Sequence, residues 1–533
     1  MRCPRRFGLS VLVLLSASSA FAAPSVISAS RHDTSAPLGQ LSATGRAPTK
    51  GPDTEGLEPR ATGPALGSGR ADPVASPLTG PLSGVTTVMS FDGQSAADNR
   101  RVLGFAFVPP DTNGAVGASQ FVQMVNVTIA VYSKRDGSQL MAPAAIHSLW
   151  RGFGGLCENG GTTPTFKDGG DPVVLYDHLA DRWLVSQLQF DETFTQTAQC
   201  VAVSTTSDAT GTYNRYEFDY GANFPDYPKF GIWPDAYYNT INVFPGNGFA
   251  GAQACAFDRA AMLAGGPASA ICFQQPPSVA SLLPADLDGS TLPPAGAPNY
   301  FVGLADASHL NLFKFHADFA DPSRSTFTGP TLIQVADYNE ICARANTVAC
   351  IAEPQPGEKV DGLADRVMFR LAYRNFGDHE SLVVNHTILG GALGGVRWYE
   401  IRNPGGAGAV FQQGTVVDPD TDFWMGSIAM DQAGDIALGF SAMSHTNFSS
   451  VHVVGRTPSQ PAGKTFGPLV LATGSGVQVN SFKRWGDYSS MTVDPKDDCT
   501  FWYTQEYYTA TGSFNWATRI AAFRFDRCKP GAR

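Results

Sequence analysis

Short apolar runs alternate with turn residues along most of the chain. From Val85 onward, runs rich in Val, Ile, Phe, Tyr and Trp are interrupted about every 8 to 12 residues by Gly, Pro, Asn or Asp, which is typical of short strands. Amphipathic segments long enough for a substantial helix are missing, and the best short helix candidate is 258–264, with Asp258 capping its first turn. The pattern predicts an all-β protein.

One hairpin recurs along the chain: an apolar strand, a small or acidic turn residue, a few polar residues and a second strand with aromatics. Turn chemistry explains the acidic residue, because an Asp side chain can bond the backbone two residues on. The copies place their turns 46 to 79 residues apart, at Gly117, Asp177, Asp235, Asp306, Asn385, Asp431 and Asp494. Such spacing predicts one supersecondary unit used seven times. In the second copy we expect strands at 172–176, 183–190, 198–204 and 213–218.

A four-stranded sheet cannot cover its own two faces, so such units stack in a line or close into a ring. The last copy has room for only three strands, near 489–493, 501–507 and 519–525. The isolated strand 85–91 is the obvious fourth, and it would protect an exposed edge. We therefore expect a single seven-bladed β-propeller closed by an N-terminal strand.

The ends of the chain differ in composition from this region. Residues 1–22 contain three arginines, an apolar run at 9–15 and a small-residue end at Ala22, which together predict a cleaved secretory signal peptide. A membrane anchor is the alternative, but the run is shorter than the roughly 20 residues needed to span a bilayer. Residues 23–84 are rich in Ser, Pro, Gly and Ala and predict a disordered linker, 85–528 the propeller, and 529–533 a C-terminal tail.

Composition and charge narrow the function classes. The chain is 43% hydrophobic and 16% charged, which excludes a disordered tail or a coiled coil. Its formal charge is −10, and removal of three arginines with the signal leaves about −13. Such an acidic chain is a poor partner for nucleic acid or anionic membranes. We expect an exported, extracellular or periplasmic monomer without a membrane span, whose partner is a glycan or another protein.

The cysteines support export. Cys3 leaves with the signal, and the remaining eight form an even set that predicts four disulfides. Eight cysteines allow 105 pairings, of which we expect the sequential one. Zinc binding is the alternative, but no pair has C-x-x-C spacing. The expected pairs are Cys157 with Cys200, Cys255 with Cys272, Cys342 with Cys350, and Cys499 with Cys528.

Four strings carry a family resemblance: the hairpin 431–435, the strand around Trp502, the run 171–177 and Arg484-Trp-Gly-Asp-Tyr488. Through the first two the chain resembles the sialidase-like group of secreted β-propellers, with its Asp-box (BNR) repeats. Through the other two it is similar to a family of uncharacterised exported bacterial propellers. The resemblance covers about 85–528 and implies an architecture. The complete Ser-x-Asp-x-Gly-x-x-Trp box is missing, so sialidase activity is not implied.

Candidate catalytic residues come from aligning 375–385 with 484–494. In a propeller such a stretch would lead into an innermost strand, near the mouth of the axis where pockets form. Asp378 and Asp487, joined by Asp111 of the string 110–114, would then share one cavity, where carboxylates raise one another's proton affinity or bind a hard cation such as calcium. No cofactor is required by this arrangement, and the identity of any metal is left unknown. The alternative is that each Asp caps its own turn.

Candidate ligand-binding residues lie nearby in the sequence. Arginines grip carboxylates with two parallel bonds, as acidic-sugar recognition requires, and aromatic rings can stack on sugars. The alternatives are ion pairs between Arg366, Arg370 or Arg374 and Asp365, Asp378 or Glu380, and aromatic packing between blades. The predicted ligand-binding residues are Arg366, Arg374, Arg484, Trp424, Trp485, Tyr488 and His379.

Other catalytic signatures fail. Val383 stands where a zinc protease helix needs its second His, and Pro458 stands where a phosphate-binding loop needs its first Gly. Two hypotheses remain. The first is a secreted protein that binds extracellular carbohydrate and cleaves it as a hydrolase or lyase at an axial pocket. The second is a non-catalytic adhesion or protein-interaction module.

Overall fold

The protein is described by a computed structural model that places residues 23–43, 53–55, 67, 69–78, 80–160, 168–246, 248–342 and 349–529. Strand accounts for 52% of the chain and helix for 7%, so the fold is all-β, as the sequence pattern predicts. The expected helix is present as α4 (Arg259–Ala264), whose first turn is capped by Asp258. The signal segment 1–22 lies outside the described residues, and so do 530–533.

Strands that follow one another in the chain pair antiparallel in groups of four. The first three groups are β7 (Asn113–Val116), β8 (Gln120–Val125), β9 (Thr128–Ser133) and β10 (Gln139–Ala145); β11 (Val173–Asp177), β12 (Arg182–Phe190), β13 (Thr197–Ser204) and β14 (Tyr213–Gly221); and β15 (Asn223–Ile232), β16 (Ala236–Pro245), β17 (Gly251–Asp258) and β18 (Ser269–Gln274). The second group matches the four strands expected at 172–218.

Three more groups follow, of which the first two form one sheet because β19 also pairs in parallel with β25, and a seventh group uses a strand from the N-terminal side. They are β19 (Leu283–Asp288), β20 (Asn299–Asp306), β21 (His309–His316) and β22 (Thr326–Gln334); β25 (Met368–Asn375), β26 (Glu380–Leu389), β27 (Gly394–Arg402) and β28 (Ala409–Val417); β29 (Asp422–Met430), β30 (Ile436–Met443), β31 (Ser450–Arg456) and β32 (Phe466–Thr473); and β33 (Ser490–Val493), β34 (Thr500–Tyr508), β35 (Trp516–Phe525) and β5 (Val85–Ser95).

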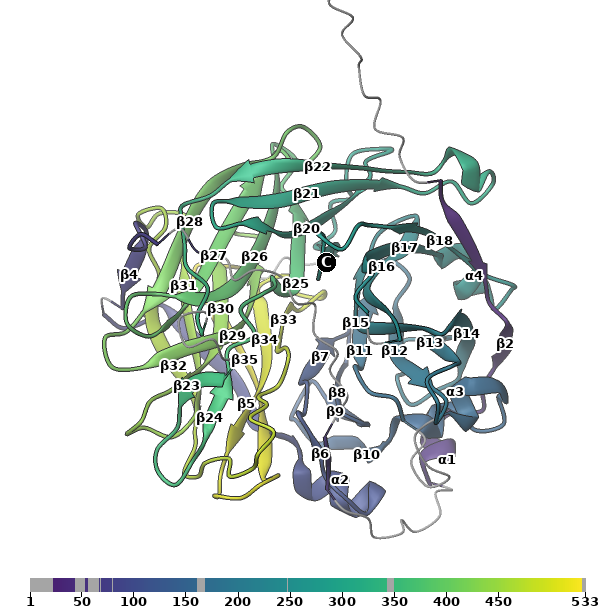
Figure 1. Cartoon of the computed structure of the whole chain (residues 1–533), viewed down its shortest axis with the longest axis horizontal. Helices are drawn as coiled ribbons and strands as arrows, with labels where there is room; N and C mark the ends of the chain where they lie inside the picture. The colour runs from purple at the N-terminus through teal and green to yellow at the C-terminus, as the bar shows by residue number, and fades with distance from the viewer. Residues whose placement is uncertain are drawn as a thin grey trace, which may run out of the picture.

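The first strands of these groups surround a common centre. They contact one another in the cyclic order β7, β11, β15, β19, β25, β29, β33 and back to β7. In Figure 1, β7, β11, β15, β25 and β33 lie near the middle of the view, whereas β10, β14, β22 and β32 lie toward its rim. Apolar side chains fill the space between neighbouring groups; the ring centroids of Phe218 on β14 and Phe257 on β17, for example, are 4.7 Å apart. Every first strand therefore presents one end to the same central region.

The strand β5 completes the last group. It pairs antiparallel with β35, with Val85 opposite Phe525 and Phe91 opposite Ile520. This strand comes from before the first group in sequence, whereas β35 ends the last one. The pairing therefore joins the two ends of the strand-rich region.

Parts of the predicted linker are ordered, which corrects the disordered assignment for those parts. β1 (Ser25–Ser28) pairs with β18, β2 (Arg31–Thr34) with β14, and β4 (Ala75–Pro77) with β28. The physical reason is that an outer strand offers unpaired backbone groups to any extended segment, even one with little apolar surface. Ion pairs add to this, because Arg215 contacts Asp33 and Arg397 contacts Asp72, each at 2.6 Å.

The remaining described elements are short. Two small sheets join β3 (Thr54–Glu55) to β6 (Phe107–Val108) and β23 (Ala349–Ala352) to β24 (Lys359–Asp361). No helix among the described residues is long and apolar enough to cross a membrane. The short helices are α1 (Leu38–Ala43), α2 (Ala96–Leu103), α3 (Gly155–Asn159), η1 (Ile146–Trp150) and η2 (Pro322–Arg324).

Two of the seven predicted turn positions are wrong. Asp306 ends β20, so it belongs to the second hairpin of its group, and Asn385 lies buried inside β26. The other five lie at or next to the first hairpin of a group. Asp431 shows the expected chemistry, because its carboxylate accepts bonds from the Ala433 and Asp435 amides. The predictions at Asp306 and Asn385 failed because an acidic or amide residue after an apolar run does not distinguish one hairpin from the next.

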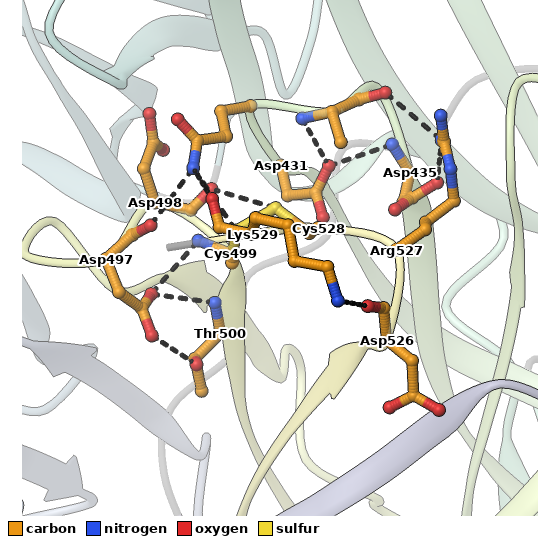
Figure 2. Close-up of a disulfide and its surroundings, with 12 residues drawn as sticks. Asp431, Asp435, Asp497, Asp498, Cys499, Thr500, Asp526, Arg527, Cys528 and Lys529 are labelled. Atoms are coloured by element: carbon orange, nitrogen blue, oxygen red, sulfur yellow. Dashed lines mark hydrogen bonds and ion pairs between the residues drawn. A yellow bond between two sulfur atoms is a disulfide. The ribbon is translucent and has the colours of Figure 1, made fainter. Parts of the chain in front are cut away.

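All four sequential disulfides are confirmed. Each joins cysteines no more than 43 residues apart, so each closes a local loop. Cys255 and Cys272 lie opposite one another on β17 and β18. Figure 2 shows the Cys499–Cys528 bridge, which ties the turn before β34 to the end of β35, with Arg527 contacting Asp435 at 2.6 Å. Four disulfides fit an extracellular protein.

Candidate functional site

Three carboxylates meet where first strands begin. Asp111 precedes β7 by two residues, Asp171 precedes β11 by two, and Asp487 precedes β33 by three. Because these three strands are neighbours in the ring, their starts lie together. The Asp487 amide donates a hydrogen bond to Asp111 Oδ1 at 2.8 Å, and all three aspartates line one cavity. Two of the predicted residues, Asp111 and Asp487, therefore do share a site.

The backbone at this site is held in an uncommon conformation. The φ angles of Asp111, Asp171 and Tyr227 are 45°, 49° and 54°, a left-handed region that non-glycine residues rarely occupy. Asn126 ties two of them together: its Nδ2 donates to Asp111 Oδ2 at 2.7 Å, and its Oδ1 accepts from the Asp171 amide at 3.0 Å. The surrounding contacts therefore hold these residues in a backbone conformation that their own φ preference disfavours.

Cationic side chains surround the carboxylates. The buried Lys229 Nζ lies 3.5 Å from the centroid of the Tyr227 ring and 4.0 Å from that of Tyr488. Arg366 lies over the same Tyr227 ring, 4.4 Å from its centroid. Arg484 contacts Asp487 at 2.6 Å. Cations over aromatic faces are stabilised by the ring quadrupole, and more so away from water.

Burial and neighbouring charges shift the pKa values of three groups in the cluster. Burial raises the pKa of Asp111 well above its usual value, and the negative charges of Asp487 and Asp171 raise it further. Burial also raises the pKa of Asp171, although Lys229 opposes this effect. Burial lowers the pKa of Lys229 to about 8. A carboxyl with a raised pKa beside an amine with a lowered pKa is the arrangement that general acid–base chemistry uses.

The cavity itself is small. Its volume is about 10 Å³, and it is lined by Asp111, Asn126, Asp171, Arg484 and Asp487 among others. A site of this size holds about one water molecule. Among the described residues, no group of three His, Cys, Asp or Glu side chains is arranged to hold a metal ion. The cluster as it stands therefore accommodates a water or one small polar group.

The predicted placement of Asp378 is wrong. Asp378 lies in the turn between β25 and β26, its side chain is 83% exposed, and it contacts His379 at 2.7 Å. That turn follows the end of a first strand, whereas Asp487 precedes the start of one. With eight residues in β25 at about 3.3 Å each, the two ends are roughly 26 Å apart. The aligned segments differ because 375–385 leads into a second strand and 484–494 into a first.

The aromatic candidates do not face a ligand. Trp424, Trp485 and Tyr488 are fully buried, and the rings of Trp424 and Trp485 are 5.4 Å apart. All eight tryptophans of the chain are buried in the same way. These rings pack inside the protein, which was the alternative interpretation, and none is free to stack on a sugar.

Arg370 and Arg374 lie on β25, and Arg366 lies two residues before that strand. Arg366 pairs with Asp365 at 2.8 Å near the carboxylate cluster. Arg370 contacts Asp286 and Asp288 at 2.7 and 2.6 Å, and Arg374 contacts Asp498 at 2.7 Å toward the opposite end. The ion-pair interpretation is therefore correct for all three arginines, but Asp378 and Glu380 are not the partners. Only Arg366 and Arg484 belong to the carboxylate cluster.

Sequence reasoning missed four members of the cluster: Asn126, Asp171, Tyr227 and Lys229. Asp171 carried a usable signal, because it stands two residues before the apolar run that begins at Val173. Lys229 carried none, since a lysine between apolar residues of a strand is as easily a surface residue. Its burial follows only from the meeting of β15 with the other first strands.

Comparison with known proteins assigns no family. No family model and no curated protein matches the chain. Structures with some similarity include an α-L-arabinanase of Penicillium chrysogenum complexed with arabinobiose, at 8% identity and a TM-score of 0.37 over 83% of this chain and 99% of that one. The α-L-arabinofuranosidase Arb93A of Fusarium graminearum has 9% identity and a TM-score of 0.33 over 79% and 95%. The polysaccharide lyase Uly1 has 11% identity and a TM-score of 0.34 over 84% and 100%. At these values, neither the sialidase-like group nor the family of uncharacterised exported propellers is confirmed.

Proposed function

We propose that this chain is an exported seven-bladed β-propeller, closed by its N-terminal strand, which binds extracellular carbohydrate and cleaves it by hydrolysis or elimination at the axial cluster. The cyclic contacts of the first strands and the pairing of β5 with β35 support the architecture. Four disulfides support export, with residues 1–22 as the signal.

The observation that carries the activity is the meeting of Asp111 and Asp487 beside Lys229. In this proposal the protonated Asp111 donates to the leaving oxygen, and a second group accepts a proton from water or from a sugar carbon. Asp487 and Lys229 are the candidates for that second role. The small cavity matches a water or a single sugar substituent, with the rest of the sugar outside it.

A panel of neutral and acidic polysaccharides tests this proposal. The exported protein is incubated with each, and new reducing ends and unsaturated products are measured. Asp487→Asn and Asp111→Asn are expected to lower product release about 100-fold or more. Asp378→Asn is the matched control, because it removes an exposed carboxylate at the far end of a first strand. Equal release from all four proteins would exclude the axial carboxylates from the chemistry.

A non-catalytic binding module is the second candidate. The size of the axial cavity favours it, because about 10 Å³ leaves no room for a sugar ring. In that case the wild-type protein binds a glycan or a protein in calorimetry, but no polysaccharide yields product. Asp487→Asn and Asp111→Asn then bind with the same affinity as wild type.

A further inference from the structure

A larger pocket lies between two neighbouring groups of strands, away from the axial cluster. Its volume is about 280 Å³, close to the smaller end of ligand pockets. We call it the β27–β31 groove; it is lined by Glu400 and Arg402 of β27, Phe411 of β28, Arg456 of β31, and His379 and Gln432 of the adjoining turns. These turns follow the ends of β25 and β29, whereas the axial cluster precedes the starts of first strands.

One cation of the groove is already neutralised. Glu400 is buried and accepts a bond from Arg402 Nε at 2.6 Å. Ser381 Oγ donates to the same oxygen, and Gln412 Nε2 donates to the other one. The Glu400 carboxylate therefore has three donors in the protein, and its charge balances that of Arg402.

A second cation is not neutralised by any ion pair in the described chain. Arg456 is only 3% exposed, its Nη2 donates to the Gln460 carbonyl at 2.8 Å, and its buried Nε has no hydrogen-bond partner among the described residues. Glu400 and Asp435 are near enough to favour its charge, but Glu400 is bonded to Arg402 and Asp435 to Arg527, each at 2.6 Å. A buried guanidinium with unused donors is costly unless a ligand supplies the acceptor.

Aromatic surface flanks these charges. The Phe411 side chain is 54% exposed, and the Arg402 guanidinium lies 3.4 Å from its ring centroid. Phe376 stacks on His379 with ring centroids 4.8 Å apart. An exposed aromatic face next to unused guanidinium donors matches a sugar ring that carries an acidic group.

We propose that the β27–β31 groove binds an anionic sugar unit, a uronate or a sulfated hexose, of an extracellular glycan. Arg456 bonds the acidic group and Phe411 packs against the face of the sugar ring. The inference rests on the proposed carbohydrate-binding function but not on cleavage, because the groove shares no residue with the axial cavity.

Calorimetry with four probes tests the proposal: oligogalacturonate for a carboxylate, carrageenan oligosaccharide for a sulfate, maltohexaose as the neutral sugar and polyglutamate as an anionic peptide. At least one of the two acidic oligosaccharides is expected to bind, at least 10-fold more tightly than maltohexaose or polyglutamate. Which of them binds identifies the acidic group. Equal binding of maltohexaose or of polyglutamate would overturn the proposal.

Variants locate the binding. Arg456→Gln is expected to weaken it at least 10-fold and Arg456→Lys less, because a lysine keeps the charge but not the fork of donors. Phe411→Ala is expected to weaken it about 5-fold without unfolding, since the ring is exposed. Phe448→Ala and Arg324→Gln, an exposed aromatic and an exposed arginine elsewhere, are the matched controls. Binding unchanged in Phe411→Ala overturns the proposal even if Arg456→Gln does not fold.

Failure here is distinguishable from failure of the proposed cleavage. Asp487→Asn is expected to keep full affinity for the acidic oligosaccharide. If the protein binds through Arg456 but releases no product from any polysaccharide, the proposed groove is supported and the proposed cleavage is contradicted. If the protein cleaves a polysaccharide but its groove variants bind as wild type does, only the proposed groove is contradicted.

Discussion

The axial region and the β27–β31 groove both contain arginines and carboxylates, but they use them differently. At the axis, Arg370 contacts two aspartates, Arg484 contacts Asp487, and the cavity that Arg484 and Asp487 line has a volume of about 10 Å³. In the groove, Arg456 contacts a backbone carbonyl and the space is about 280 Å³. Charges that neutralise one another inside the protein maintain its structure, whereas a charge left over beside open space can bind a ligand.

The largest effect on stability is expected where a buried arginine and its aspartate partners neutralise one another. Arg370→Met leaves Asp286 and Asp288 buried without their cation, and we expect the free energy of unfolding to fall by about 3–5 kcal/mol. Urea denaturation measures it. Adding Asp286→Asn and Asp288→Asn to the same chain should recover most of the loss. Arg135→Met, at a side chain that is 88% exposed, should change the free energy of unfolding by less than about 0.5 kcal/mol. A loss below about 1 kcal/mol in Arg370→Met would contradict the comparison.

The pH dependence of stability isolates Lys229. Burial lowers its pKa to about 8 from 10.5, so between these values the unfolded chain holds a proton that the folded chain has released. This group therefore raises the free energy of unfolding as pH rises through that window, by at most about 1.4 kcal/mol per pH unit. Lys229→Met removes the effect. In urea denaturation, the free energy of unfolding of wild type minus that of Lys229→Met should increase from about pH 8 to pH 10. The same pH dependence in both proteins would contradict a buried amine at this position.

A smaller effect, an increase in ligand affinity, is expected from a substitution in the groove. Glu400→Gln removes the carboxylate that neutralises Arg402, so the groove becomes more positive. We expect the affinity for the acidic oligosaccharide to rise about 3- to 10-fold, which is on the order of 1 kcal/mol. Added salt should reduce this gain, because the groove is open to solvent. Calorimetry at two salt concentrations measures both, and weaker binding by the variant would contradict the assignment of charges.

The smallest effect is expected at Asp378. Its side chain is exposed and contacts only the neighbouring His379 by an ion pair. Asp378→Asn should change the free energy of unfolding by less than about 0.5 kcal/mol and product release by less than about 2-fold. A loss of activity comparable with that of Asp487→Asn would show that the two ends of the axis act together.

Much of the fold could be predicted because its signals are local. The Asp177 carboxylate accepts from the amides of Leu179 and Ala180, two and three residues on, so the turn is visible in the sequence. Sequential cysteine pairing succeeded because Cys255 and Cys272 lie on strands that follow each other. The helix at 258–264 was found through its cap. The ordered parts of 23–84 were missed because their order depends on edges supplied by distant strands.

The candidate site was only half predictable. Asp487 was found by aligning 484–494 with 375–385, and Asp111 was added from the turn-like string 110–114, but the same alignment placed Asp378 with them. Trp485 and Tyr488 were chosen as exposed rings, yet their environment comes from neighbouring groups of strands. Burial and cavity membership are properties of the packed ring, and residue spacing does not report them.

The amino-acid sequence by itself determined the strand-rich class, most turns, the disulfide partners and the strand that pairs with β35, because each depends on nearby residues or on a simple count of strands. Only the tertiary structure decided which end of each strand meets which cavity, and which charges remain unpaired. The physical reason is that a Gly-Asp turn has the same local energetics at either end of a strand, whereas the electrostatic surroundings of its carboxylate are set by residues that are hundreds of positions away, such as Asp111 beside Asp487.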